Sequence, residues 1–202
     1  MQQLFAKNNF KGFVESVPAY TSLAVFYDVK TVKKNYPFDS TVFDFVKIFT
    51  EQLLMQLNGQ EPELQSASIT IPVYYNGDDL ALIATTHQLS AEEVIRIHTS
   101  KIYRVFMVGF LPGFTYMGSV DERIATTRRL SPRIKVPAGS VGIAGFQTGI
   151  YPLDSPGGWQ LLGQTPVKIF DKEKTGPCLL KAGDQVQFIS ISKATFEKLN
   201  EY

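Results

Sequence analysis

The stretch that most constrains the fold is residues 131–166, SPRIKVPAGSVGIAGFQTGIYPLDSPGGWQLLGQTP. It contains seven of the fifteen glycines and five of the eleven prolines, yet from Gly139 to Gly163 it has one charged residue, Asp154, in a chain that is 19% charged. Linkers rich in Gly and Pro are normally polar, whereas here large apolar side chains alternate with the glycines. The pattern indicates a tightly folded backbone that approaches either another strand of the same barrel or a ligand. We therefore place the functional region here.

The bulk composition excludes several classes of protein. The chain has 202 residues, enough for one full core or two modest ones, and its net charge of +1 gives no electrostatic reason to expect nucleic acid or an anionic membrane as a partner. No apolar run approaches the length of a membrane span, and the first ten residues lack the apolar core of a signal peptide, so we expect a cytoplasmic protein. The single cysteine, Cys178, excludes a disulfide framework and is expected to be buried.

Two domains are predicted. Residues 11–17 and 21–28 are β-rich runs that predict a hairpin, and a helix is expected to begin at Ser40-Thr41 and to stop at Asn58-Gly59. The polar segment 60–66 predicts a boundary, which gives a small α/β domain over 1–66 and a second domain over 67–202.

The second domain is predicted to be mainly β. A strand is expected over 69–75, and the capping box Ser90–Glu93 begins a short helix that ends near His98. The remaining chain consists of short β-runs separated by Gly and Pro, which favours a β-barrel or a sandwich.

Motifs for common cofactors are missing from the sequence. There is no phosphate-binding loop, and the glycines of GSVGIAG (139–145) recur at every third position, which is not the dinucleotide-binding spacing. Neither HExxH nor CxxC occurs, so no metal site is predicted.

Three residues are candidates for catalysis. His98 at the end of the capped helix is either an imidazolium favoured by the helix C-terminus, or a general acid/base or substrate contact that faces the Gly-rich segments. Arg133 and Lys135 would suit a carboxylate or a phosphate, although the basic cluster formed by Arg128, Arg129, Arg133 and Lys135 is also compatible with a solvated turn.

The candidates for substrate binding are aromatic or uncharged polar side chains in two glycine-punctuated segments, residues 109–118, which also contain Phe110, and residues 131–166. The aromatic ones line either an apolar pocket or the core, and the polar ones either bridge loops or contact a polar small molecule. They are Phe114, Tyr116, Gln147, Thr148, Tyr151, Trp159 and Gln160.

Several motifs in order along the chain resemble the family of the 5-oxoprolinase B subunit, which includes allophanate hydrolase subunit 1 and the inhibitor of a sporulation histidine kinase. These motifs are VPAYTSLAVFYD, LSAEEVIRIHTS, VFMVGFLPGFTYMG, the run from Leu130 to Pro166, and AGDQVQFISIS. The resemblance implies a C-terminal cyclophilin-like β-barrel and a small N-terminal ferredoxin-like α/β domain.

The resemblance also implies a multi-subunit reaction. In it, ATP-dependent opening of 5-oxoproline to L-glutamate requires two further proteins, a C subunit similar to biotin-dependent carboxylases and an A subunit that is a hydrolase. ATP, with Mg²⁺, would be bound in complex with the C subunit, and this chain alone would be inactive.

The resemblance has one gap at the start of the chain. Family members usually begin with a strand before the first helix, whereas MQQLFAKNNF resembles the tail of that helix. The first strand is therefore expected to be missing, which leaves a sheet edge open to a partner or to a second copy in a homodimer.

Two other functions stay open within the family. The chain could inhibit a histidine kinase through a protein surface, or it could act on allophanate or urea-like amides. A peptidyl-prolyl isomerase activity, suggested by fold analogy alone, is not favoured.

Overall fold

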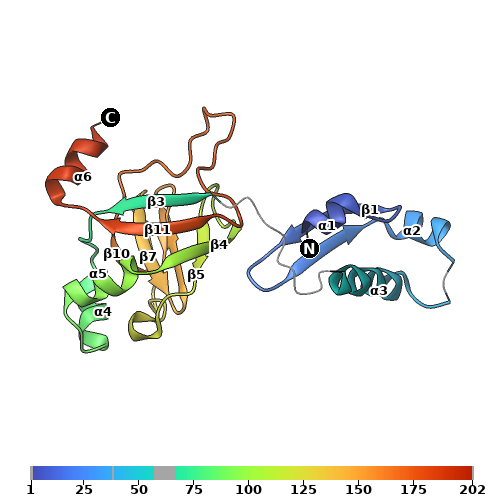
Figure 1. Ribbon diagram of the computed structural model, residues 1–202, viewed down its shortest axis with the longest axis horizontal. Coiled ribbons are helices and arrows are strands. Elements are labelled where there is room, and N and C mark those ends of the chain that lie inside the picture. The colour runs from blue at the N-terminus through green and yellow to red at the C-terminus, as the bar shows by residue number, and fades with distance from the viewer. Residues whose placement is uncertain (1, 38, 57–66, 202) are drawn as a thin grey trace. The chain divides into compact units, whose positions relative to one another are not determined.

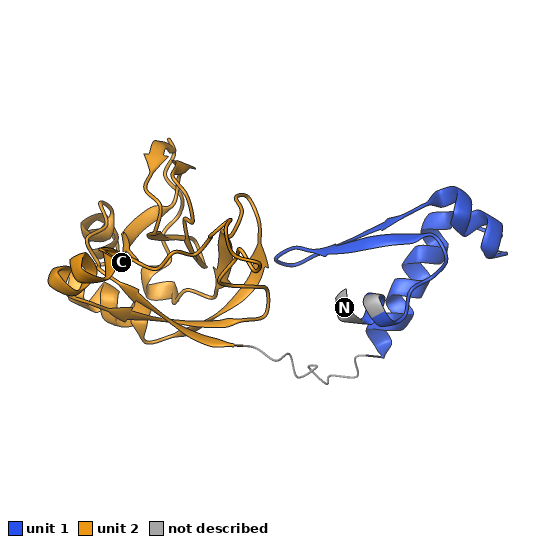
Figure 2. Cartoon of the chain, turned by 90° about the horizontal axis from the view of Figure 1, so that it is seen from above, with its two compact units in different colours: residues 1–65 blue, residues 66–202 orange. Residues whose placement is uncertain are grey.

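The computed structural model describes residues 2–37, 39–56 and 67–201. The chain divides into two compact units, residues 1–65 and 66–202, which Figure 2 colours separately. The segment 60–66, which the sequence predicts as the boundary, lies outside the described residues, as does the expected helix stop at Asn58-Gly59.

The first unit has the order helix–strand–strand–helix–helix. Its elements are α1 (Gln2–Lys7), β1 (Phe13–Pro18), β2 (Leu23–Tyr27), α2 (Val29–Asn35) and α3 (Val42–Met55). The antiparallel pairing of β1 with β2 confirms the predicted hairpin. Helix α3 begins as expected, because Thr41 is its N-cap and forms a capping box with Asp44. Helix α1 at the start of the chain agrees with the helix tail expected from the resemblance.

Aromatic rings fill the core of the first unit. Phe10 is 3% exposed and lies edge-on to Phe45 and Phe49, with centroid distances of 5.7 and 5.1 Å. Val32 from α2 and Leu53 from α3 complete this core. The periodic apolar positions of α3 therefore form the face of the helix that packs into this core.

The second unit is built on seven strands in one sheet, in the order β10-β7-β8-β5-β4-β11-β3. These strands are β3 (Ser68–Val73), β4 (Ile102–Val108), β5 (Thr115–Gly118), β7 (Ser140–Ala144), β8 (Gln147–Ile150), β10 (Gln160–Gln164) and β11 (Gln185–Ser190). Tyr74, directly after β3, exchanges two backbone hydrogen bonds of 2.8 and 2.9 Å with Gln164 of β10. The two edges of the sheet therefore meet, and the expected β-barrel is confirmed as a nearly closed one (Figure 1).

Glycines of the constraining stretch lie where two barrel strands approach closely. A Cβ on Gly149 would lie 2.6 Å from the carbonyl oxygen of Thr115, and one on Gly142 would lie 3.0 Å from that of Gln160. Most of the uncharged run is thus packed against other strands of the same barrel, which was one of the two alternatives. The other alternative, a backbone that approaches a ligand, applies to the residues of this run that follow β8.

Helices cover the barrel on one side, where α4 (Leu80–Thr86) packs on β10 and α5 (Ala91–Thr99) packs on β11 (Figure 1). Ser90 and Glu93 form the predicted capping box of α5. The sequence analysis did not predict α4 or the C-terminal α6 (Lys193–Asn200). The short α6 has no buried residue, so no strong apolar periodicity marks it.

Two small elements complete the unit. Strands β6 (Arg133–Val136) and β9 (Ser155–Gly157) pair with each other outside the barrel sheet, and η1 (Glu122–Ile124) is a single 3₁₀ turn. The expectation that Cys178 is buried is wrong, because its loop leaves the thiol exposed. Across the described ranges, no helix combines the length and the apolar character needed to cross a membrane.

Candidate functional site

A cavity of about 280 Å³ opens beside the β6–β9 ribbon. Its walls come from three segments: the turn after β4 together with strand β5, the loop before β6, and the stretch from β8 to β10. The lining residues are Phe110, Phe114, Tyr116, Arg128, Pro132, Tyr151, Pro156, Gly157, Gly158 and Trp159. Four of the seven predicted substrate-binding residues are among them, namely Phe114, Tyr116, Tyr151 and Trp159.

The aromatic walls form one interlocked cluster. Phe114 is at its centre, edge-on to Trp159 at 5.3 Å, to Tyr151 at 5.1 Å and to Tyr116 at 4.8 Å between ring centroids. Phe114, Tyr151 and Trp159 are at most 5% exposed, so their ring positions are fixed by packing. The cavity is therefore preformed in this structure, with apolar walls that suit a compact ligand.

A strained turn holds the rim of the cavity. Phe110 has φ of 70°, a left-handed conformation that a side chain with a Cβ rarely adopts, and it is 64% exposed. The following Gly113 has φ of 83° and packs against Phe170, where a Cβ would lie 2.9 Å from the Cβ of that residue. Strain of this kind often occurs at ligand contacts, and here it presents an exposed aromatic ring to the cavity.

Arg128 supplies the positive charge of the cavity. Its guanidinium carbon lies 5.8 Å from the centroid of the Trp159 ring, which is within the range of a cation–π contact. Burial raises the pKa of Tyr116 and of Tyr151. The nearby charge of Arg128 opposes the shift of Tyr116, whereas the pKa shift of Tyr151 is opposed first by a backbone hydrogen bond with Trp159 and then by Arg128. Both phenols therefore keep their protons at neutral pH and can donate hydrogen bonds to a ligand.

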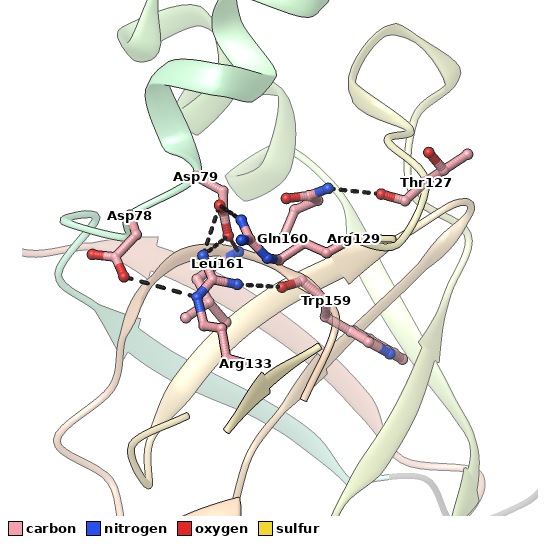
Figure 3. A network of polar contacts seen from close by, with 8 residues as sticks. All are labelled: Asp78, Asp79, Thr127, Arg129, Arg133, Trp159, Gln160 and Leu161. Carbon is pink, nitrogen blue, oxygen red and sulfur yellow. Dashed lines mark hydrogen bonds and ion pairs between the residues drawn. The ribbon is translucent and has the colours of Figure 1, made fainter. Parts of the chain in front are cut away.

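A buried carboxylate anchors the wall that carries Trp159 (Figure 3). Asp79, 3% exposed, accepts two hydrogen bonds of 2.7 Å from Nη2 of Arg133 and one of 2.7 Å from the backbone N–H of Leu161. Arg129 adds a bond of 3.2 Å to the same carboxylate, and Nη1 of Arg133 donates to the carbonyl oxygen of Trp159 at 3.3 Å. The carboxylate thus fixes Trp159 through Arg133 and through the start of β10.

This network changes the role expected for two catalytic candidates. Arg133 is bound to Asp79 and orients Trp159, so its guanidinium is occupied by a protein carboxylate rather than aimed into the cavity. Lys135 is exposed and pairs with Asp154 at 2.7 Å, and it does not line the cavity. In the structure, each of these two side chains is therefore paired with a protein carboxylate.

The predicted amide readers also lie outside the cavity walls. Gln160 is 5% exposed and donates through Nε2 to the carbonyl oxygen of Thr127 at 2.9 Å, which ties β10 to the loop that carries Arg128 (Figure 3). Gln147 lies at the start of β8, in register with Gly118 and with Ala144. Gln160 is a positioning residue for the arginine loop in this arrangement.

His98 and Thr148 lie in the interior of the barrel, and both are 0% exposed. Thr148 donates its hydroxyl proton to the carbonyl oxygen of Gly142 at 3.1 Å, so it accepts from Nε2 of His98 at 3.0 Å. Nδ1 then accepts from the Tyr75 hydroxyl at 2.7 Å. Burial lowers the pKa of His98 to about 3. The ring is therefore neutral and fully bonded and is not the imidazolium that the sequence suggested. It does face the Gly-rich segment, through Thr148, but it does not line the cavity.

The neutral state of His98 predicts a pH dependence of stability. The folded pKa of about 3 lies below the ordinary value of 6.5, so the unfolded chain binds the proton first as the pH falls. We expect the unfolding free energy to be constant above pH 6.5 and then to fall as the pH drops from 6.5 towards about 3, by up to about 1.4 kcal/mol per pH unit. Urea denaturation at a series of pH values measures this slope.

The second histidine gives the matched control for that series. His87→Gln should keep the slope, because His87 caps α4 and bonds to Thr126 outside the barrel interior. His98→Gln should abolish most of it. An equal slope in both variants would show that another group causes the acid sensitivity.

Arg128 is a cavity residue that the sequence analysis did not single out as a site residue. Arg128 was placed only in a basic cluster, and nothing in the sequence separates it from Arg129, which binds Asp79. Phe110 was expected, with Phe114 and Tyr116, to line either an apolar pocket or the core of a barrel end, and the structure places it at the pocket.

Metal-ligating side chains do not gather at this cavity. Within the described part of the chain, no group of three His, Cys, Asp or Glu side chains converges as a set of metal ligands. The charge available at the cavity is therefore that of Arg128.

Comparison with protein families and curated proteins extends these observations. The family model of the carboxyltransferase domain, subdomain C and D, matches residues 1–180. A Bacillus subtilis (strain 168) protein described as the B subunit of 5-oxoprolinase is 47% identical over 196 residues, which is 95% of this chain and 81% of that protein.

Solved structures show the same fold. The crystal structure of TTHA0988 matches with a TM-score of 0.73 and 35% identity, over 95% of this chain and 35% of that one, so this chain spans about a third of that protein. The K. lactis urea amidolyase matches with a TM-score of 0.73 over 98% of this chain and 13% of that one, at 20% identity. This last likeness concerns the fold alone.

Proposed function

Because this chain belongs to the family of the carboxyltransferase domain, subdomain C and D, we propose that it acts as the B subunit of a 5-oxoprolinase. The observation that carries the proposal is the 47% identity to the Bacillus subtilis protein of that description over nearly the whole chain. The proposed reaction is ATP-dependent opening of 5-oxoproline to L-glutamate, together with a carboxylase-like C subunit and a hydrolase, the A subunit.

The chemistry explains why several subunits would take part. A five-membered lactam is a stable amide, and transfer of the γ-phosphoryl group of ATP to its oxygen makes the ring carbon electrophilic. Water then adds to that carbon, the C–N bond breaks, and a second water releases phosphate, so that ADP, phosphate and glutamate result. The task for this chain is to bind and orient the lactam in a site that excludes water.

The aromatic cavity supports this division of labour. It offers apolar walls, two protonated tyrosines and one guanidinium, all of which bind and orient. Among the described residues that line it, none is a Ser, a Cys or a carboxylate that could act as a nucleophile. In this proposal, the nucleotide and Mg²⁺ are held with the C subunit.

A reconstitution experiment tests the proposal. We expect this chain with the C and A subunits to form glutamate from 5-oxoproline with ATP hydrolysis, and the chain alone to form none. The measurement is phosphate and glutamate release with each protein omitted in turn. Turnover by the isolated chain, or a complete set that 5-oxoproline fails to stimulate, would contradict the proposal.

The same assay distinguishes a second candidate. A Saccharomyces cerevisiae protein described as urea amidolyase is 40% identical over 136 residues, which is 61% of this chain, and this favours a urea-type amide as the alternative substrate. ATP hydrolysis stimulated by urea but not by 5-oxoproline would replace the first assignment with the second.

A further inference from the structure

Two adjacent arginines in the loop before β6 have different environments. Arg129 binds the buried carboxylate of Asp79 at 3.2 Å, and Arg133 does the same at 2.7 Å. Arg128 is exposed at the cavity, and within the described residues it has neither an ion pair nor a side-chain hydrogen bond. Arg128 thus leaves its charge available to a ligand.

The Trp159 ring holds Arg128 in place without using its hydrogen-bond donors. A guanidinium over an indole face is attracted through the ring quadrupole, and the N–H groups at its edge stay free. Arginine presents these donors as a planar fork that matches the two oxygens of a carboxylate. The geometry therefore resembles an anion receptor whose base is aromatic.

The cavity beneath limits what else the ligand can contain. Its volume of about 280 Å³ lies at the small end of the range for ligand sites, and most of its walls are rings. A compact ring of a few atoms fills such a space and gains from contact with the faces of Trp159 and Tyr116. An inorganic anion would gain from Arg128 but leave these apolar walls unused.

We propose that Arg128 binds the carboxylate of a small cyclic acid whose ring occupies the aromatic cavity, and that this contact selects carboxylated lactams over neutral amides. The inference rests on the proposed function for the identity of the lactam. Arg128 is then the specificity-determining residue of the site, and Trp159 positions both the ring and the guanidinium.

The single tryptophan of the chain makes the test specific to this cavity. Ligand-induced changes in Trp159 fluorescence report on the site directly, and calorimetry supplies the binding constant where the optical change is small. The probes are 5-oxoproline, the neutral lactam 2-pyrrolidinone, cyclopentanecarboxylate, which lacks the amide, and inorganic phosphate.

We expect the full-length chain to bind 5-oxoproline and cyclopentanecarboxylate more tightly than 2-pyrrolidinone. Arg128→Gln should weaken the binding of both carboxylates by about 10- to 100-fold, since a charge-assisted hydrogen bond is lost. It should leave the affinity for 2-pyrrolidinone unchanged. Arg128→Lys should bind the carboxylates with an affinity between those of the parent chain and Arg128→Gln, because the charge remains but the planar fork of donors is lost. Arg96→Gln on the exposed face of α5 removes the same charge away from the cavity and should bind like the parent chain.

Each outcome bears on one of the two proposals. Carboxylate binding that depends on Arg128 supports the receptor even if the reconstituted subunits fail to convert 5-oxoproline, which would overturn the proposed function alone. Equal affinity of the parent chain and Arg128→Gln, absence of carboxylate binding, or binding of phosphate without the carboxylates would overturn the receptor, and activity of the complex would still stand.

Discussion

Replacing Asp79 with asparagine is expected to lower the unfolding free energy by about 3 kcal/mol. The carboxylate is 3% exposed and accepts from Arg129, Arg133 and the N–H of Leu161. Removing one partner of a buried ion pair costs about 3–5 kcal/mol in other proteins. The lower end applies here because the Arg129 side chain is 38% exposed, so water can solvate part of the charge that is released. Urea denaturation of both proteins measures the difference.

The surface pair of Asp154 and Lys135 provides the control for this substitution. Both side chains are more than half exposed, and Asp154 also accepts from the N–H of Ala138, which an asparagine oxygen can still do. Asp154→Asn should therefore cost no more than about 1 kcal/mol.

Asp79→Asn should also shift the emission of Trp159, whose carbonyl oxygen is bound by Arg133. Equal stability of Asp79→Asn and Asp154→Asn would show that the network does not anchor this wall of the cavity.

Replacing Gly163 with alanine is expected to cost about 3 kcal/mol, at the upper end of what overpacking usually costs. An added Cβ would overlap the carbonyl oxygen of Tyr74, the residue that closes the barrel against β10. The obstacle is backbone, so it cannot rotate away, and the closing hydrogen bonds of 2.8 and 2.9 Å would lengthen or break. Thermal and urea denaturation report the loss.

Gly176 is the matched control for that change. A Cβ at Gly176 would have no atom within 4 Å, and its φ lies outside the left-handed region. Gly176→Ala should therefore stay within about 0.5 kcal/mol of the parent chain. A Gly163→Ala variant as stable as this control would mean that the barrel is not closed at Tyr74.

The parts of the fold that depend on local pattern could be predicted from the sequence. The β1–β2 hairpin, the N-cap at Thr41 and the capping box at Ser90 each rest on residues near one another in the chain, and all three are confirmed. The barrel was expected as an alternative to a sandwich, because short strands with Gly and Pro turns fit both.

The site was harder to predict because contacts distant in sequence decide it. Asp79 binds the N–H of Leu161, 82 positions away, and the guanidinium of Arg133, 54 positions away, which in turn donates to the carbonyl oxygen of Trp159. His98 has the same local pattern whether its helix end is exposed or buried, and only the packing of Phe188 and Tyr103 on its ring shows that it is buried. Arg128 differs from Arg129 solely in what the fold places opposite each side chain.

A crystal structure of the chain with 5-oxoproline bound gives the most direct test of the account. We expect the lactam ring to lie against the Trp159 indole and its carboxylate to lie on the Arg128 guanidinium, with the aromatic walls little moved. Ordered 5-oxoproline elsewhere on the molecule, with the cavity between Phe110, Tyr151 and Trp159 holding only solvent, would contradict it.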